Sequence, residues 1–162
     1  KGDTLLIDVG ANIDPKPSHL FQYALMGEAY ARYVLERERP TVGLLNVGEE
    51  ETKGTDASRQ TYAMLEASGI NFVGNVEGRD IFSGEYDVIV CDGFAGNVAL
   101  KTAESLAYAI GQVLKRTLAM SLITSRWRGV SGSVGTRSAS GLRLRIIWTR
   151  PVASNLITCV DI

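Results

Sequence analysis

Four short apolar segments of the sequence are each followed at once by a polar segment that contains glycine, and this arrangement constrains the fold most. The apolar segments cover residues 4–9, 41–47, 71–74 and 87–91. Strands that are apolar throughout are typical of a parallel sheet buried on both faces. Amphipathic patterns predict helices over residues 18–38, 56–68 and 97–118. The alternation predicts an α/β fold, a three-layer α/β/α domain with a mostly parallel sheet.

The charge pattern divides the chain near residue 119. Residues 1–118 hold all of the lysines, whereas residues 119–162 hold six Arg, no Lys and one acid, Asp161. We therefore expect one α/β domain over residues 1–118, followed by an atypical tail over residues 119–162. The tail is interpreted as a disordered Ser/Gly/Arg linker, a basic surface-binding segment, or a stretch translated out of frame. Within it, the run LRLRIIW has strand-like character.

Overall composition excludes several classes of protein. A net charge of −1 gives no general attraction to nucleic acid or to an anionic membrane. The two cysteines are too few for a disulfide framework or a zinc site. There is no secretory signal pattern and no apolar run of the ~18 residues that a membrane span requires. These features predict a cytoplasmic protein.

Each predicted strand ends in a motif of polar residues that can bind a ligand or take part in catalysis. The four motifs are DVGAN, NVGEEETKG, GNVEGRD and CDGFAGN. Ligands of open parallel sheets bind beyond the carboxyl ends of the strands, so the four motifs are expected to form one cleft. Neither GxxxxGK[ST] nor GxGxxG follows any strand, which argues against ATP and NAD. No cofactor and no metal are predicted.

The fourth motif predicts an anion site. A turn from Asp92 to Gly96, with glycines Gly93 and Gly96, precedes a helix expected to begin at Asn97, and its backbone N–H groups would point into the cleft. Lys101 would then lie in the first turn, where the helix dipole disfavours a cation and a bound phosphate would compensate it. A solvated lysine is the alternative.

Other polar residues are candidates for the same cleft. Lys53 is a possible second phosphate contact, oriented by ion pairing with the neighbouring glutamates, of which Glu49 and Glu50 lie nearest the strand end. The side-chain amides of Asn12, Asn46 and Asn75 can donate to a carbonyl or phosphate oxygen. Turn formation is the competing role of these asparagines.

Four carboxylates complete the candidate set, and they are expected to position Lys53, Arg79 or Lys101 or to act as a general base. They are Asp8, Glu77, Asp80 and Asp92. Cys91 ends an apolar strand, where a buried hydrophobic role is expected rather than a nucleophilic one. His19, the single histidine, is expected to cap or pack a helix start.

Three long stretches of the sequence closely resemble the acyl-carrier-protein phosphate acyltransferases of bacterial glycerolipid synthesis. They are LLIDVGANIDPKPSHLFQYALMGEAYARYVL, VGLLNVGEEETKGTDASRQTYAMLEASGINFVGNVEGRDI and YDVIVCDGFAGNVALKTAESLA. The resemblance runs from about Asp3 to about Thr117. Upstream segments and a downstream basic helical region of the family are not matched, which suggests an incomplete copy.

The resemblance implies a fold similar to isocitrate and isopropylmalate dehydrogenases and to phosphotransacetylase, with no metal or nucleotide. It also implies transfer of a fatty acyl group from acyl-carrier protein to inorganic phosphate, a homodimer, a downstream membrane acyltransferase and at most peripheral membrane association. Phosphate held by residues 93–97, Lys101 and Lys53 would attack the thioester, and the asparagine amides would stabilise the oxyanion.

Two alternatives stay open at this point. A phosphate acetyl- or butyryltransferase on the same fold would take the acyl group from coenzyme A. A non-catalytic fragment or binding module of the same family would not turn over these substrates.

Overall fold

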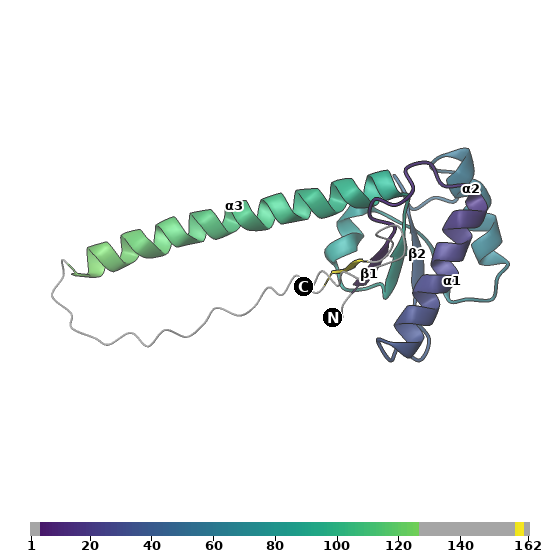
Figure 1. The fold of residues 1–162 in the computed structure, drawn as a ribbon, viewed down its shortest axis with the longest axis horizontal. Coiled ribbons are helices and arrows are strands. Elements are labelled where there is room, and N and C mark those ends of the chain that lie inside the picture. The colour runs from purple at the N-terminus through teal and green to yellow at the C-terminus, as the bar shows by residue number, and fades with distance from the viewer. Residues whose placement is uncertain (1–3, 127–157, 161–162) are drawn as a thin grey trace. The chain divides into compact units, whose positions relative to one another are not determined.

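The structure is a computed structural model that describes residues 4–126 and 158–160 (Figure 1). In chain order, its elements are strand β1 (Thr4–Ile7), helix α1 (Pro17–Tyr33), strand β2 (Val42–Leu45), helix α2 (Asp56–Glu66), strand β3 (Phe72–Val76), the 3-10 helix η1 (Gly78–Phe82), strand β4 (Val88–Val90), helix α3 (Gly93–Arg126) and strand β5 (Thr158–Val160).

The strands form one sheet with the order β3-β2-β4-β1-β5. β1 to β4 run parallel, and β5 pairs antiparallel with β1. α1 packs against β1, β2 and β4, and also against α2, which covers β3. The connection from β3 to β4 passes through η1, which contacts β1. The predicted α/β class with a mostly parallel sheet is confirmed.

The core lies between the sheet and α1. Fully buried side chains from three strands, including Leu5, Ile7, Leu44 and Val88, meet the buried face of α1. On that face, a Cβ at Gly27 would stand 2.6 Å from Cγ1 of Val88, so a residue without a side chain is needed for the helix to lie this close. The dense contact fixes α1 on the sheet and thereby fixes the loop that precedes it.

A polar clamp joins the starts of β2 and β4 at the opposite edge from the candidate cleft. Oδ2 of Asp87 accepts hydrogen bonds from the backbone N–H of Thr41 (2.9 Å) and from its hydroxyl (3.0 Å). The Thr41 hydroxyl oxygen accepts in turn from the backbone N–H of Asp87 at 2.9 Å. The clamp stabilises the pairing of two strands that are far apart in sequence.

Several predicted boundaries were wrong. α1 ends at Tyr33 rather than near residue 38, because Glu36 adopts a positive φ of 57° that a helix does not allow. Lys16 rather than Ser18 occupies the N-cap of α1. β3 extends to Val76, two residues beyond the prediction.

α3 begins at Gly93, four residues before the predicted start at Asn97. The backbone N–H of Ala95 donates to Oδ1 of Asp92 at 2.8 Å, which is the contact of an N-cap residue. A cap at Asp92 stabilises a helical turn where the two glycines suggested an irregular one.

The chain divides into two compact units, and the boundary falls after Ala99. In the second unit, α3 continues to Arg126, beyond the predicted end at residue 118. Large apolar side chains recur there at spacings of three and four residues, and all are more than half exposed: Leu106, Ile110, Val113, Leu114 and Leu118. The strand-like run at residues 142–148 lies outside the described residues, and β5 was not predicted.

None of the helices within residues 4–126 and 158–160 combines the length and the apolar character needed to cross a membrane.

Candidate functional site

The segments that follow β1, β2, β3 and β4 meet at one edge of the sheet, because these strands are parallel and neighbours in the sheet. β4 lies between β2 and β1, so the segment after β4 is flanked by the other two. The structure therefore brings the four predicted motifs to a common edge, and it changes what several of their side chains are free to do.

The loop after β1 is shaped by Asp8, which is fully buried. Its Oδ1 accepts hydrogen bonds from the backbone N–H groups of Gly10 (2.9 Å) and Ala11 (2.7 Å), and its Oδ2 accepts from Asn12 (2.9 Å). Both carboxylate oxygens are thus used within the loop. Asp8 holds the loop in shape, and among the described residues it forms no ion pair with Lys53, Arg79 or Lys101, which was one of the two roles expected of it.

Asn12 joins that loop to two helices. Its backbone oxygen accepts the N–H of Gly93 at the start of α3 (2.8 Å), and its side-chain amide lies 3.2 Å from Nδ1 of His19. Nδ1 of His19 also lies 3.4 Å from the backbone N–H of Lys16 at the start of α1. The expected capping role of His19 is confirmed, and the amide of Asn12 already has a partner.

The start of α3 packs against the loop after β1. A Cβ at Gly96 would overlap the backbone oxygen of Asp8 and would lie 2.8 Å from Sγ of Cys91. The N–H groups of Gly93, Ala95 and Gly96 donate to Asn12, to the Asp92 side chain and to the Asp92 backbone, respectively. The predicted phosphate cradle of free amides at Gly93 to Asn97 is wrong for these three groups.

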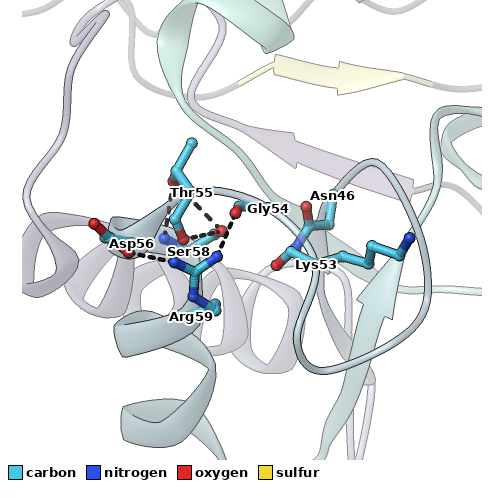
Figure 2. Close-up of polar contacts among 7 residues, drawn as sticks. All are labelled: Asn46, Lys53, Gly54, Thr55, Asp56, Ser58 and Arg59. Carbon is cyan, nitrogen blue, oxygen red and sulfur yellow. Dashed lines mark hydrogen bonds and ion pairs between the residues drawn. The ribbon is translucent and has the colours of Figure 1, made fainter.

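The loop after β2 is held closed by two asparagines. The amide of Asn46 donates to the backbone oxygen of Lys53 (3.0 Å), and its Oδ1 accepts from the N–H of Val47 (2.9 Å). The amide of Asn75, from β3, donates to the backbone oxygen of Glu50 (2.9 Å). Figure 2 shows the Lys53 side chain extending away from the start of α2. Both asparagines are therefore engaged in fixing the loop.

Asn75 also carries an unusual acceptor. Its side chain is 6% exposed, and its Oδ1 is buried with no hydrogen-bond partner among the described residues. Such an atom is costly to bury, typically by ~1–3 kcal/mol. The predicted oxyanion contact through Asn75 would therefore have to use an amide that the loop already occupies.

A polar cluster at the start of α2 was missed by the sequence prediction. Thr55 caps the helix by accepting the N–H of Ser58 (3.1 Å), and the Ser58 hydroxyl donates to the backbone oxygen of Thr55 (2.9 Å). Arg59 donates to the backbone oxygen of Gly54 (2.7 Å) and pairs with Asp56 (Figure 2). Thr directly after a glycine at a predicted helix start was the signal that points to this cap.

The carboxylates after β3 are paired with Arg79 rather than with a lysine. Arg79 contacts Glu49 (2.7 Å), Glu77 (3.3 Å) and Asp80 (3.9 Å). The hydrogen bond that Arg79 donates to Glu49, followed by the charge of Glu77, raises the pKa of Arg79. Arg79 was one of the three cations considered for Glu77 and Asp80. The prediction that Glu49 orients Lys53 by ion pairing was wrong, because that carboxylate faces Arg79.

The thiol of Cys91 is buried beneath the same edge and donates to the backbone oxygen of Asp8 at 3.2 Å. Burial raises the pKa of this thiol far above its usual range, and the nearby Asp92 and Asp8 act in the same direction. A thiol that stays protonated is a poor nucleophile. The interpretation of Cys91 as a small buried hydrophobe is supported.

Lys101 belongs to the second unit and has a partner of its own. Its ammonium lies 3.0 Å from Oε2 of Glu104, three residues along α3. Because the helix begins at Gly93, Lys101 lies beyond the first turn, where the dipole effect has faded. The helix dipole therefore does not call for a bound phosphate beside Lys101, contrary to the expectation from the sequence.

Three candidate side chains keep their polar groups available. Among the described residues, Lys53 forms no ion pair, and the Glu50 carboxylate and the Asn97 amide form no side-chain hydrogen bond. Asn97 lies beside Gly10 in the loop after β1, since a Cβ there would be 3.8 Å from that of Asn97. An ammonium, an amide and a carboxylate at one sheet edge can bind an anion and move a proton.

Comparison with known proteins places this edge in a chemical context. Residues 1–130 match the sequence profile of a family described as "Fatty acid synthesis protein". The chain is 53% identical over 124 residues to a phosphate acyltransferase of Geotalea uraniireducens, and 53% identical over 123 residues to one of Aquifex aeolicus. It is 56% identical over 117 residues to a phosphate acyltransferase of Bacillus pumilus.

These matches cover 76% of this chain for the first two relatives and 72% for the third. They cover 36%, 36% and 35% of the relatives, respectively, so the chain spans about a third of the length of the curated relatives it matches.

Proposed function

Because the chain belongs to the phosphate acyltransferase family of fatty acid synthesis proteins, we propose that it takes part in the transfer of a fatty acyl group from acyl-carrier protein to inorganic phosphate. The observation that carries the proposal is that an ammonium (Lys53), an amide (Asn97) and a carboxylate (Glu50), each without a side-chain partner among residues 4–126 and 158–160, follow two adjacent parallel strands.

In this reaction, a phosphate oxygen attacks the thioester carbonyl carbon, the carbon–sulfur bond breaks, and an acyl–oxygen–phosphorus linkage forms. Lys53 binds the phosphate through charge, and Asn97 donates to the oxyanion of the tetrahedral intermediate. Glu50 accepts the proton that phosphate loses, and the departing sulfur of the carrier protein takes it up as a thiol. Asn12, Asn46, Asn75 and Asp8 act by holding the loops that present these groups.

Replacing Lys53 with alanine is expected to lower phosphate-dependent thiol release by about 10²-fold, the size of effect typical for losing one charge-stabilising donor. The measurement is the release of free carrier-protein thiol from palmitoyl-acyl-carrier protein, with and without phosphate. Lys115→Ala, which removes an exposed lysine of α3, is the matched control and is expected to leave the rate unchanged. Lys101→Ala tests the remaining lysine candidate.

An equal rate for Lys53→Ala and Lys115→Ala would contradict the role given to Lys53. Release from an acyl-CoA donor in place of the carrier protein would support the phosphate acetyl- or butyryltransferase alternative. The absence of release from either donor would contradict acyl transfer by this chain.

We further propose that the family's homodimer covers the apolar stripe of α3. Leu106, Ile110 and Leu114 lie on one side of the helix at i, i+4 and i+8, and all are exposed. Exchanging Ile110 for Glu is expected to shift a dimer to monomer in sedimentation velocity, because a charge opposes burial of the stripe. The control is Gln112→Glu, which adds the same charge elsewhere on the helix. A wild-type chain that is already monomeric would contradict this.

The product, an acyl phosphate, would pass to a downstream membrane acyltransferase. We expect the reaction to take place in the cytoplasm, with peripheral contact to the membrane. Recovery of the chain only after detergent extraction of the membrane fraction would contradict this location.

A further inference from the structure

A cavity of about 270 Å³ opens at the same sheet edge, between the loop after β1, the ends of β2 and β4, and the first turn of α2. Its inner wall is apolar and continuous with the core, since Leu20 and Leu44 are 4% and 1% exposed. Leu45 extends this wall along β2. The cavity therefore offers apolar contact at the same sheet edge as the groups assigned to the reaction.

The mouth of the cavity, its exposed side, includes two large apolar side chains beside the polar Asp14 and Thr55. Ile13, from the loop after β1, and Phe94, from the start of α3, both line the cavity. They are nevertheless 72% and 63% exposed. A ligand that crosses this mouth would cover both side chains as well as the inner wall, and each apolar area removed from water stabilises the complex. Cavity and mouth together suit an elongated apolar group.

The charges at the cavity exclude an anion from its interior. The charged residues among its lining are Asp14 and Asp92, and both are acidic. The Asp92 carboxylate is held at the start of α3 by the N–H of Ala95, so it cannot turn away without losing that cap. Phosphate and a fatty acid carboxylate are therefore repelled, whereas a neutral acyl thioester is not.

We propose that this cavity holds the segment of the fatty acyl chain next to the thioester, with the remainder of the chain crossing the Ile13 and Phe94 mouth. The inference rests on the proposed acyl transfer and names the subsite for its apolar substrate. A volume of about 270 Å³ is just below the ~300–1,000 Å³ of pockets that enclose whole drug-sized ligands, so the cavity takes part of a long chain.

The test is direct binding of S-acyl N-acetylcysteamine thioesters, which are soluble and neutral, to the full chain by isothermal titration calorimetry. Affinity is expected to rise about fourfold for each methylene added from butanoyl to octanoyl, as burial of methylene groups predicts. Free octanoate is expected to bind at least tenfold more weakly than the octanoyl thioester, because its carboxylate meets Asp14 and Asp92.

The variant Ala57→Leu fills the cavity from α2, where Ala57 is part of its lining. It is expected to weaken octanoyl thioester binding about tenfold. Ala63→Leu is the matched control, since it makes the same exchange at an exposed position of the same helix and is expected to bind normally. Circular dichroism of both variants establishes that each is folded.

Equal weakening in both variants, equal affinity for octanoate and its thioester, or no thioester binding at all would each overturn the inference. Binding does not require turnover, so the two proposals fail separately. Thioester binding that Ala57→Leu weakens, without phosphate-dependent thiol release, would contradict the proposed reaction while supporting the subsite.

Discussion

Replacing Asp8 with alanine is expected to lower the free energy of unfolding by about 3 kcal/mol or more, because three backbone N–H groups lose a charged acceptor at once. The side chain is fully buried, so little water is available to replace it. Urea denaturation followed by circular dichroism measures the change. The loop after β1 would also lose the shape that places Asn12 against α3.

The control for this variant is Asp14→Ala, six residues along the same loop. Asp14 is exposed, and surface exchanges of this kind usually change stability by no more than ~0.5 kcal/mol. If Asp8→Ala were as stable as the wild type, the carboxylate could not be what holds the loop.

The Gly96→Ala variant is expected to be destabilised by about 3 kcal/mol or more, at the upper end of overpacking effects, because its methyl group would overlap backbone rather than a movable side chain. The obstructing atom is the backbone oxygen of Asp8, at the foot of the loop that forms the candidate site. Chemical denaturation measures the loss. Thioester binding is expected to weaken as well, because α3 and this loop line the cavity together.

Gly111→Ala is the matched control in the same helix. A Cβ at Gly111 has nothing within 4 Å, so the exchange is expected to stabilise the chain by about 0.5–1 kcal/mol through helix propensity. If Gly96→Ala lowers the free energy of unfolding and Gly111→Ala raises it, the effect of close packing is separated from that of helix propensity. If both variants changed the free energy of unfolding in the same direction, this would argue against close packing of Gly96 on the backbone of Asp8.

The sequence was sufficient for the class of fold and for the edge of the sheet where the site lies. Continuous apolar runs such as residues 87–91 carry their own signal, because a strand buried on both faces has no polar side. The position of the motifs then follows from strand direction alone. β5 could not be predicted in this way. It has only three residues, and they pair with β1, which lies at the other end of the sequence.

The use of individual side chains could not be predicted in the same way. Asn46 and Asn75 looked like free amide donors, but each finds a backbone carbonyl that only the folded loop brings within reach. From the sequence, Glu77 and Asp80 could equally have paired with a lysine. In the folded chain, both lie near the guanidinium of Arg79. Hydrogen-bond partners depend on distances set by packing, whereas a residue type reveals only what a group can donate or accept.

The glycines near the start of α3 illustrate a conflict between local and tertiary effects. Gly93 and Gly96 indicate a turn by propensity, yet both are helical because Asp92 caps the segment and the helix start packs on the loop after β1. That packing requires glycine at position 96, so the same residue that weakens the helix signal in the sequence makes the helix position possible.

The order of strands in the sheet has a consequence for how the chain folds. β4 lies between β1 and β2, although it is made after both of them. A growing chain that has not yet reached Val88 therefore has two strands that cannot pair with each other in their native positions. β2 can pair with β3 on one edge, but its other edge and the facing edge of β1 must both wait for β4, which raises the contact order and slows folding. During that interval, the apolar edges of β1 and β2 are open to pairing with other chains, and folding of this domain is expected to depend on how quickly β4 arrives.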